Sequence, residues 1–327
     1  IMKRRNILRT IGTVSAVIAL AVAGQFATTS SAEAQGRFTL ATSQPGGAWY
    51  PMAAGLVSMY NDKIPNTVWT VEKGGGSSNN KTLSLEKVEF AWVSGDMMHL
   101  ARKGEKPFDK KYDQTHFRVI GQMPASDSHW VVMKNSSIKS LADLRGKRVA
   151  IAKRGSSANR RAFIMLGLYG VTDKDLTPSY IGDDQASKAL VDGRIDASID
   201  FIPAPAPPVA NLSTTHDIRL LSMEPEKAAE LRKKFPYFAP LTIKAGTYRG
   251  VDKDVPTFGV PGWYLVLDRV PDDVVYQATK VLFENIKTLM NVHPAFDNIE
   301  MNPIAKSVTT HDLHPGALKY YKEKGVL

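Results

Sequence analysis

The 327-residue chain contains no cysteine. Disulfide bonds, thiol nucleophiles, iron–sulfur clusters and cysteine-ligated zinc are therefore excluded. The cysteine that a lipid anchor requires is missing as well, so we expect no lipid anchor. Hydrophobic residues make up 43% of the chain and charged residues 23%, which is typical of a globular protein and not of a disordered one.

Catalytic motifs are also scarce. The sequence has no G-x-S-x-G and no H-E-x-x-H, the patterns of common hydrolases and zinc proteases. Residues 75–82 come close to a phosphate-binding loop, but Asn80 stands where that motif requires glycine. We therefore expect no enzyme activity, no cofactor and no metal. A secreted enzyme, or a surface sensor or adhesion protein, is the alternative.

The formal net charge of +10 is dispersed along the chain. Its densest clusters are short, at residues 153–154, 160–161 and 233–234. No zinc-finger spacing or aromatic RNA-binding motif accompanies them, so nucleic acid is not an expected partner. Acidic ligands or an acidic surface suit a basic secreted protein better.

The first 34 residues have the pattern of a secretory signal peptide. Basic residues at positions 3, 4, 5 and 9 precede an apolar run at residues 11–23, and Ala32-Glu33-Ala34 resembles a cleavage site. The apolar run is shorter than the roughly 20 residues that span a bilayer, although an N-terminal membrane anchor is the alternative. We expect cleavage before Gln35 and a soluble mature protein, residues 35–327, in the periplasm.

Short β-type runs alternate with glycine-rich turns and helical stretches along the mature chain. The helix predicted nearest the C-terminus spans residues 272–292, because its apolar residues recur at helical spacing. The alternation predicts an α/β fold with parallel sheets and right-handed crossovers. Residues 119–123 and 129–133 are expected to form two strands joined by a polar loop. The other predicted strands are 38–42, 67–71, 89–93, 148–152, 195–201, 218–223 and 263–267.

Two strand-like runs, at residues 130–133 and 263–267, stand apart from the alternating pattern. If both strands cross between two lobes, the middle of the chain forms a second domain that is inserted into the first domain. The first lobe would then comprise residues 35–130 plus 262–327, and the second lobe residues 131–261. A simple tandem of two domains also fits the composition.

The same local design occurs twice, once in each predicted lobe. G-S-S-N-N at residues 76–80 and G-S-S-A-N at residues 155–159 each follow a strand and open a helix. Glycine permits a sharp turn, serine and asparagine cap helices, and the free N–H groups of a helix start attract anions. Two ordinary capped helices are the simpler alternative. The repetition nevertheless predicts a cleft that holds a ligand with negative charge.

Further candidate residues follow strand ends, where ligands lie in parallel sheets. Arg154 beside the second loop favours a carboxylate, because a guanidinium group can donate two parallel hydrogen bonds. Each candidate also has a structural alternative: core packing for Trp49 and Tyr50, an internal ion pair for Asp200, and a solvated surface position for Arg154. The predicted ligand-binding residues are Gly47, Trp49, Tyr50, Gly76, Ser77, Ser78, Ser94, Asp96, Arg154, Gly155, Ser156, Ser157 and Asp200.

Several of these segments resemble the TAXI class (TRAP-associated extracytoplasmic immunogenic) of solute receptors, which serve TRAP transporters. The opening pattern G-G-x-aromatic-Y-P stands at residues 46–51, followed by G-G-S at 75–77 and V-S-G-D at 93–96. The resemblance covers nearly all of residues 37–327. Its other segments are I-K-S-L-A-D-L-R-G-K-R-V at 138–149, D-G-R-I-D-A at 192–197, A-G-T-Y at 245–248, D-V-P-T at 254–257 and H-P-G-A-L-K-Y-Y at 314–321.

The resemblance implies a two-lobed periplasmic-binding-protein-like fold of type II. Each lobe would be a mixed, mostly parallel sheet flanked by helices, and two strands would cross between the lobes. It further implies a monomeric receptor that closes like a Venus flytrap around a small anionic solute and delivers it to a TRAP membrane permease.

The solutes that the resemblance implies are C4–C5 dicarboxylates or acidic amino acids, such as glutamate or 2-oxoglutarate. This chain departs from the family pattern at residues 43–45, at Ser198 and Asp200, and in the proline-rich run 203–208. Its specificity can therefore differ from that of the glutamate binders.

Overall fold

The computed structural model describes residues 36–45, 48–299 and 312–327. The expected signal peptide, residues 1–34, lies outside the described residues, and so does Gly47. Residues 1–36 and 37–327 form two separate units. Every element below belongs to the second unit, apart from Gly36, at which the first strand begins.

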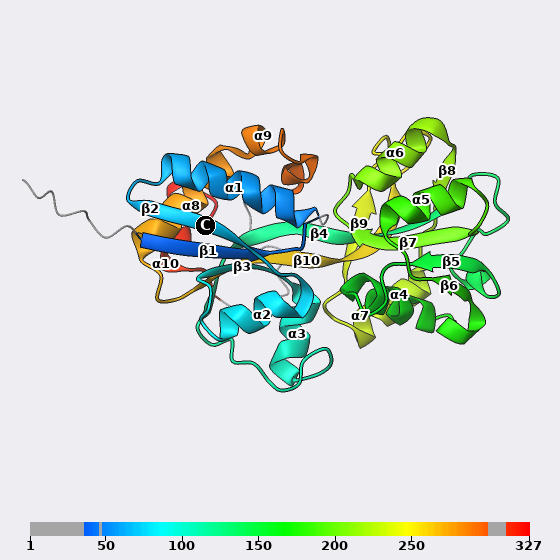
Figure 1. Ribbon diagram of the computed structural model, residues 1–327, viewed down its shortest axis with the longest axis horizontal. Helices are drawn as coiled ribbons and strands as arrows, with labels where there is room; N and C mark the ends of the chain where they lie inside the picture. The colour runs from blue at the N-terminus through cyan, green and yellow to red at the C-terminus, as the bar shows by residue number, and fades with distance from the viewer. Residues whose placement is uncertain (1–35, 46–47, 300–311) are drawn as a thin grey trace, which may run out of the picture. The chain divides into compact units, whose positions relative to one another are not determined.

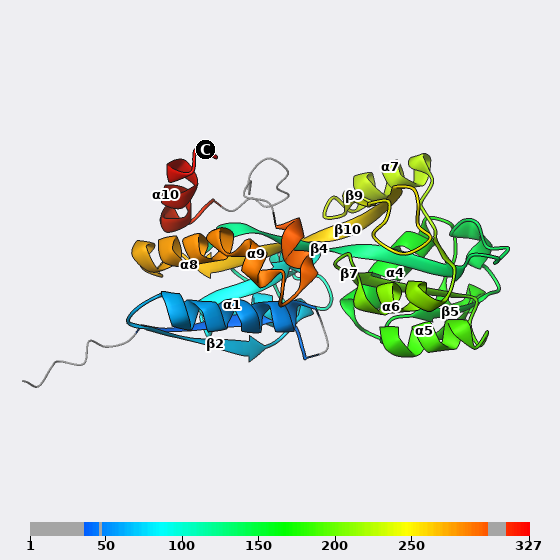
Figure 2. The same ribbon diagram turned by 90° about the horizontal axis from the view of Figure 1, so that it is seen from above.

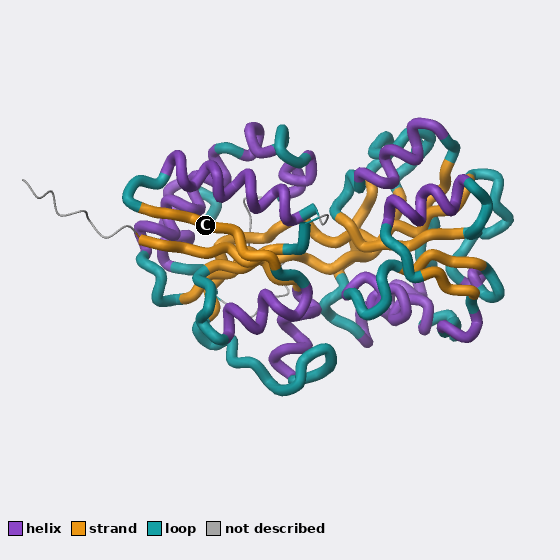
Figure 3. Tube along the Cα trace, in the orientation of Figure 1, coloured by secondary structure: helices purple, strands orange, loops and turns teal. Residues whose placement is uncertain are grey.

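Ten strands of the described chain form one sheet with helices on both faces (Figure 3). They are β1 (Gly36–Thr42), β2 (Thr67–Lys73), β3 (Phe90–Ser94), β4 (Phe117–Met133), β5 (Arg148–Ile151), β6 (Thr177–Ser179), β7 (Ala197–Ile202), β8 (Ile218–Leu220), β9 (Ala239–Ile243) and β10 (Val255–Leu267). The strand order is β2-β1-β3-β10-β4-β7-β5-β6, with β8 beside β4 and β9 beside β10. The β1–β3, β5–β6 and β5–β7 pairs are parallel, as the strand–helix alternation predicts.

Two long antiparallel strands, β4 and β10, lie at the centre of the sheet (Figure 2). Their pairing runs from Gly259 opposite Asp127 to Leu267 opposite Phe117. β10 pairs with β3 near its end and with β9 near its start, while β4 pairs with β7 and β8 in its second half. The β4–β10 pair therefore connects strands β1–β3 to strands β5–β9.

The polar loop predicted between residues 123 and 129 is wrong, because these residues continue β4 as a strand. At Asp127 the strand is paired on both sides, opposite Gly259 of β10 and opposite Ile202 of β7. The buried hydroxyl of Ser128 lies 2.7 Å from the hydroxyl of Thr257 in β10. Polar residues are tolerated in a central strand when their backbone and side-chain groups are hydrogen-bonded.

Helices cover both faces of the sheet (Figure 1). Around strands β1–β3 lie α1 (Trp49–Lys63), α2 (Gly76–Ser84), α3 (Gly95–Lys103), α8 (Asp272–Glu284), α9 (Ile286–Leu289) and α10 (Pro315–Glu323). Around strands β5–β9 lie α4 (Ser157–Gly167), α5 (Asp183–Val191), α6 (Pro207–Thr215) and α7 (Pro225–Lys234). Among the described residues, no helix has the length and apolar character needed to cross a membrane.

The helix predicted at residues 272–292 is interrupted at Asn285, between α8 and α9. The Asn285 side-chain amide donates a hydrogen bond to the Val281 carbonyl oxygen at 2.7 Å. Asparagine side chains that bond to nearby backbone groups compete with helical hydrogen bonding. The apolar spacing therefore identified the buried face of this segment but not its break.

The buried apolar side chains of the described residues fall into three clusters. One draws on residues between Phe38 and Met123 and between Trp263 and Tyr321, and the other two draw on residues between Trp130 and Val260. We call the elements around the first cluster (β1–β3, α1–α3, α8–α10) the first element group, and those around the other two (β5–β9, α4–α7) the second element group. The lobe boundaries at residues 130 and 262 stay a prediction.

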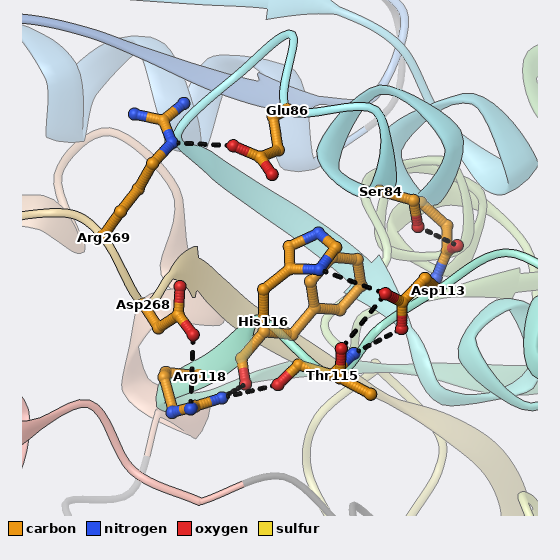
Figure 4. A network of polar contacts seen from close by, with 10 residues as sticks. Ser84, Glu86, Asp113, Thr115, His116, Arg118, Asp268 and Arg269 are labelled. Carbon is orange, nitrogen blue, oxygen red and sulfur yellow. Dashed lines mark hydrogen bonds and ion pairs between the residues drawn. The ribbon is translucent and has the colours of Figure 1, made fainter.

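A network of partly exposed polar contacts lies where β3, β4 and β10 meet their flanking turns (Figure 4). Arg269 Nε lies 2.9 Å from a Glu86 carboxylate oxygen, and Arg118 Nη2 lies 3.3 Å from an oxygen of Asp268. Exposed ion pairs of this kind contribute roughly 0–1 kcal/mol each. The network is therefore a minor contribution to the stability of the fold.

Gly259 allows a test of the close approach of the central strands. A Cβ atom at this position would lie 2.5 Å from the Ser126 carbonyl oxygen of β4 and 2.5 Å from Leu241 Cδ1 of β9. We expect Gly259→Ala to lower the free energy of unfolding by about 1–3 kcal/mol, the usual cost of overpacking, in urea denaturation. Gly167→Ala is the matched control, because its Cβ would meet nothing within 4 Å. Equal destabilisation by the two substitutions would contradict this packing.

Candidate functional site

A cavity of about 1030 Å³ is lined by residues of both element groups. Its wall includes turns that follow strands β1, β2, β5 and β7, residues near the ends of β3 and β7, Ser126 of β4, and the first turns of five helices. These strand ends are where ligands lie in sheets with parallel strands. Polar side chains in the wall belong to Ser43, Trp49, Tyr50, Ser94, Ser126, Lys153, Ser156, Ser157, Arg161, Asp183, Asp184, Gln185, Asp200 and His293.

Trp49 and Tyr50 form an aromatic part of the wall at the start of α1. Trp49 also packs inward, with its ring perpendicular to that of Trp92 at a centroid distance of 6.1 Å. Gly262 makes room for this ring, because a Cβ there would lie 2.5 Å from the indole. Trp49 therefore belongs both to the cavity wall and to the packed interior.

The first glycine-rich loop is held by Asn79. The Gly75 N–H donates to the Asn79 side-chain oxygen at 2.7 Å, while the Asn79 amide donates to the carbonyl oxygens of Thr42 and Trp92. Gly75 adopts φ +116°, a value that favours glycine, and it lines the cavity with Gly76. The loop thus turns sharply with its backbone against the cavity.

The second loop repeats this arrangement around Asn159. The Asn159 side-chain oxygen accepts from the Gly155 N–H, its amide donates to the Ile151 carbonyl, and the Ser156 hydroxyl caps α4 by accepting from the Asn159 N–H at 3.1 Å. Gly75 and Asn79 of the first loop thus correspond to Gly155 and Asn159 of the second. Aligning the two G-S-S sequences would instead pair Gly76 with Gly155, so the structural correspondence is shifted by one residue. Ala152 before this loop adopts φ +33°, and strained residues of this kind gather at functional sites.

The two loops meet at the cavity. A Cβ on Gly76 would lie 3.2 Å from the Ser157 hydroxyl oxygen, so the starts of α2 and α4 are close neighbours. Within the described chain, the backbone N–H groups of Gly76, Ser77, Ser157 and Ala158 donate no hydrogen bond. Free N–H groups at helix starts suit an anion or a carbonyl oxygen.

Beside the cavity lies a largely buried ion cluster, two residues of which, Ser94 and Arg161, belong to the wall. Asp96, in the first turn of α3, is 0% exposed. Arg161 of α4 donates to its two oxygens from Nε and Nη2, each at 2.8 Å, and Arg160 pairs with the same carboxylate. The Ser94 hydroxyl, which is part of the wall, donates to Asp96 at 2.7 Å and accepts from Arg161 Nη2 at 3.0 Å. Because α3 and α4 belong to different element groups, the cluster joins the groups beside the cavity.

This cluster sets the protonation state of Asp96. Burial by itself would raise the pKa of Asp96, but the guanidinium groups of Arg161 and Arg160 and the Ser94 hydroxyl outweigh it and lower the pKa to about 2. Asp96 is therefore ionised across the physiological pH range.

Carboxylates line another part of the cavity. Burial, then the neighbouring Asp184, raise the pKa of Asp183 to about 6, against the opposing effect of Lys153. Asp200 stands near the end of β7, where one of its oxygens accepts from the Phe201 N–H at 2.6 Å. The cavity therefore contains acidic as well as basic groups; among the acidic ones, Asp200 is predicted from the sequence, whereas Asp183 and Asp184 are not.

The structure brings some of the predicted residues together and not others. Gly155 and Asp96 lie outside the wall, and so does Arg154, whose guanidinium carbon sits 3.9 Å from the centroid of the Tyr180 ring. As ligand contacts, all of the predicted residues stay predictions. Those in the cavity wall are Trp49, Tyr50, Gly76, Ser94, Ser156, Ser157 and Asp200, whereas Ser77 and Ser78 lie outside it and Gly47 is not among the described residues.

Arg161 and Asp183 are wall residues that the sequence did not single out as ligand contacts. The sequence carried one signal for Arg161, the pair Arg160-Arg161 just after the second loop, but nothing in it indicated which arginine faces inward.

Within the described part of the chain, no three His, Cys, Asp or Glu side chains are grouped as a metal site would require.

Comparison with known proteins assigns the chain to a family. Residues 40–325 match the NMT1-like family, and the chain belongs to it. PhnD1 from Prochlorococcus marinus, solved in complex with methylphosphonate, is a similar structure: 13% identity, coverage of 89% of this chain and 99% of that one, and a TM-score of 0.51.

Two further solved structures are similar at lower TM-scores. A TctC solute-binding protein from Polaromonas is 16% identical, and the match covers 80% of this chain and 88% of that one with a TM-score of 0.49. The periplasmic aliphatic sulphonate-binding protein SsuA from Escherichia coli is 14% identical, with coverage of 88% and 83% and a TM-score of 0.48. The expected α/β fold of the periplasmic-binding-protein kind is confirmed, and at these identities the likeness concerns the fold alone.

The low pKa of Asp96 makes its contribution to stability dependent on pH. Because the folded-state pKa of about 2 lies below the ordinary value of 3.8, the contribution is fully present above about pH 4 and is lost as the pH falls towards 2. At pH 7, Asp96→Asn should lower the free energy of unfolding by about 3–5 kcal/mol, since it leaves two guanidinium groups without their carboxylate. Urea denaturation at a series of pH values should show this difference shrink by about 2 kcal/mol between pH 4 and pH 2.

Asp192→Asn is the control for this experiment. Its carboxylate pairs with Arg194 at the surface, where the two side chains are 54% and 64% exposed, so we expect a loss below about 1 kcal/mol. A difference between wild type and Asp96→Asn that does not change with pH would contradict the ion cluster.

Proposed function

We propose that the protein is the periplasmic solute-binding receptor of a TRAP-type secondary transporter, of the TAXI class, and that it captures a small organic acid in its cavity. The observation that carries this proposal is the meeting of two helix starts, one from each element group, at Gly76 and Ser157. Helix starts with free N–H groups attract carboxylates. Membership of the NMT1-like family and a periplasmic-binding-protein fold support the same function.

The two element groups would act as lobes, residues 35–130 plus 262–327 and residues 131–261. Bodies joined by a pair of strands such as β4 and β10 can hinge. A solute that touches both lobes then favours the closed state by its differential affinity. The cavity volume of about 1030 Å³ is at the upper end of the usual range for small-molecule sites, about 300–1,000 Å³, which leaves room for closure around a C4–C5 acid.

The charges in the wall narrow the class of solute. Lys153 and Arg161 are basic, whereas Asp183, Asp184 and Asp200 are acidic. An acidic amino acid such as glutamate offers carboxylates to the first set and an ammonium group to the second. A C4–C5 dicarboxylate such as 2-oxoglutarate uses only the basic groups and the helix starts.

The proposal includes a location and a partner. The signal-peptide pattern of residues 1–34 would direct the chain to the periplasm. There it would act as a soluble monomer, without catalysis, and would hand its solute to the membrane permease of the transporter.

Thermal denaturation with a panel of acids, sugars, neutral amino acids and polyamines tests this function. Ligand at 100 times its dissociation constant stabilises the folded state by about 2.7 kcal/mol, so we expect a small acid to raise Tm by about 5–10 °C. Amide forms of the same acid are the matched controls and should raise Tm less. A best ligand with no anionic group would refute the proposed class of solute.

A further inference from the structure

The buried cluster at Asp96 contains one carboxylate and two guanidinium groups. The Arg161 side chain is 4% exposed and that of Arg160 is 27% exposed. Within the described chain, neither arginine forms an ion pair with any carboxylate other than Asp96, and Arg160 Nε is buried without a hydrogen-bond partner. The cluster thus has one positive charge more than its single carboxylate balances, on a side chain that is only partly exposed, and an anion beside the cluster would be favourable.

Of the three charged residues in this cluster, Arg161 is the one that lines the cavity. Its Nε and Nη2 atoms are committed to Asp96 and Ser94. Its Nη1 atom donates no hydrogen bond to any described residue, and it is not one of the buried polar atoms that lack a partner. The two N–H groups of Nη1 therefore have no partner among the described residues, on a side chain that belongs to a wall residue.

The Arg161 guanidinium is held in one orientation. Asp96 fixes one edge of the fork through two hydrogen bonds, and the guanidinium carbon lies 5.7 Å from the centroid of the Phe201 ring, another wall residue. A side chain that is fixed before the ligand arrives loses little conformational freedom on binding. Arg161 is in this respect a pre-organised anion-binding group.

The neighbouring basic residues are less suited to this role. Lys153 lies close enough to Asp183 to act on the pKa of that carboxyl group, so part of its charge is already balanced. Arg154 lies over the Tyr180 ring and outside the wall.

We infer that Arg161 binds a carboxylate of the solute through its Nη1 N–H groups, and that Asp96 and Ser94 are positioning residues that aim it. This inference rests on the proposed function, since it names the contact by which the receptor recognises an anionic solute. A carboxylate at Nη1 would also balance the excess charge of the cluster. Because Asp96 and Arg161 come from different element groups, the contact forms where the groups meet.

The test compares acids with their amides in two variants and a control. The probes are L-glutamate, 2-oxoglutarate and succinate, with the amide formed at each carboxylate in turn, and calorimetry measures each dissociation constant. Arg161→Gln removes the charge and the fork. Arg161→Lys keeps a charge for Asp96 but loses the fork, and it serves if the glutamine variant does not fold. Arg194→Gln, at an exposed position outside the cavity, is the matched control.

We expect Arg161→Gln to weaken the best-bound acid by about 10- to 100-fold, as for a charged hydrogen bond, and Arg161→Lys to weaken it less. For the amide that lacks the carboxylate at Arg161, the same substitutions should change the affinity less than about twofold. Arg194→Gln should leave every dissociation constant within about twofold of wild type.

Two results would overturn the inference and leave the proposed function intact. In the first, a folded Arg161 variant binds the acid as tightly as Arg194→Gln does. In the second, the Arg161 variants weaken the binding of the acid and of all its amides by the same factor, which would show that Arg161 has a structural role. If none of the three acids binds the wild-type protein, the proposed solute class fails and the inference fails with it.

Discussion

The architecture depends on one pair of antiparallel strands. β4 and β10 run through the whole sheet, and the remaining strands attach to one or the other half of that pair. Polar residues are accommodated at the middle of this pair because the hydroxyls of Ser128 and Thr257 lie 2.7 Å apart and satisfy each other. The strand ends of both element groups are thereby brought to one cavity.

A second constraint lies beside that cavity. The two loops are fixed by buried asparagines, Asn79 and Asn159, which hold the backbone from within and leave the helix starts free. Next to them, Asp96 of α3 forms an ion cluster with Arg160 and Arg161 of α4, which has more positive than negative charge. Free N–H groups and an excess guanidinium charge act in the same direction, and both favour an anionic ligand.

Local patterns predicted much of this structure. The strands at residues 38–42, 67–71 and 148–152 and both glycine-rich loops could be located because glycine, β-branched residues and helix caps act over a few neighbouring residues. Residues 123–129 could not be predicted as strand, since their polar side chains are stabilised by partners more than 70 residues away. The ion cluster escaped prediction for the same reason: Asp96 and Arg161 are 65 positions apart, and no local signal shows that they meet.

The central claim is that one solute contacts both element groups through the starts of α2 and α4. Hydrogen–deuterium exchange with the best-bound acid tests it most directly, because the first N–H groups of a helix have no partner within the helix and exchange rapidly until something binds them. We predict that saturating acid slows exchange in peptides covering residues 76–79 and residues 157–160 together. Protection of one helix start without the other, at proven saturation, would contradict a solute held between the two groups.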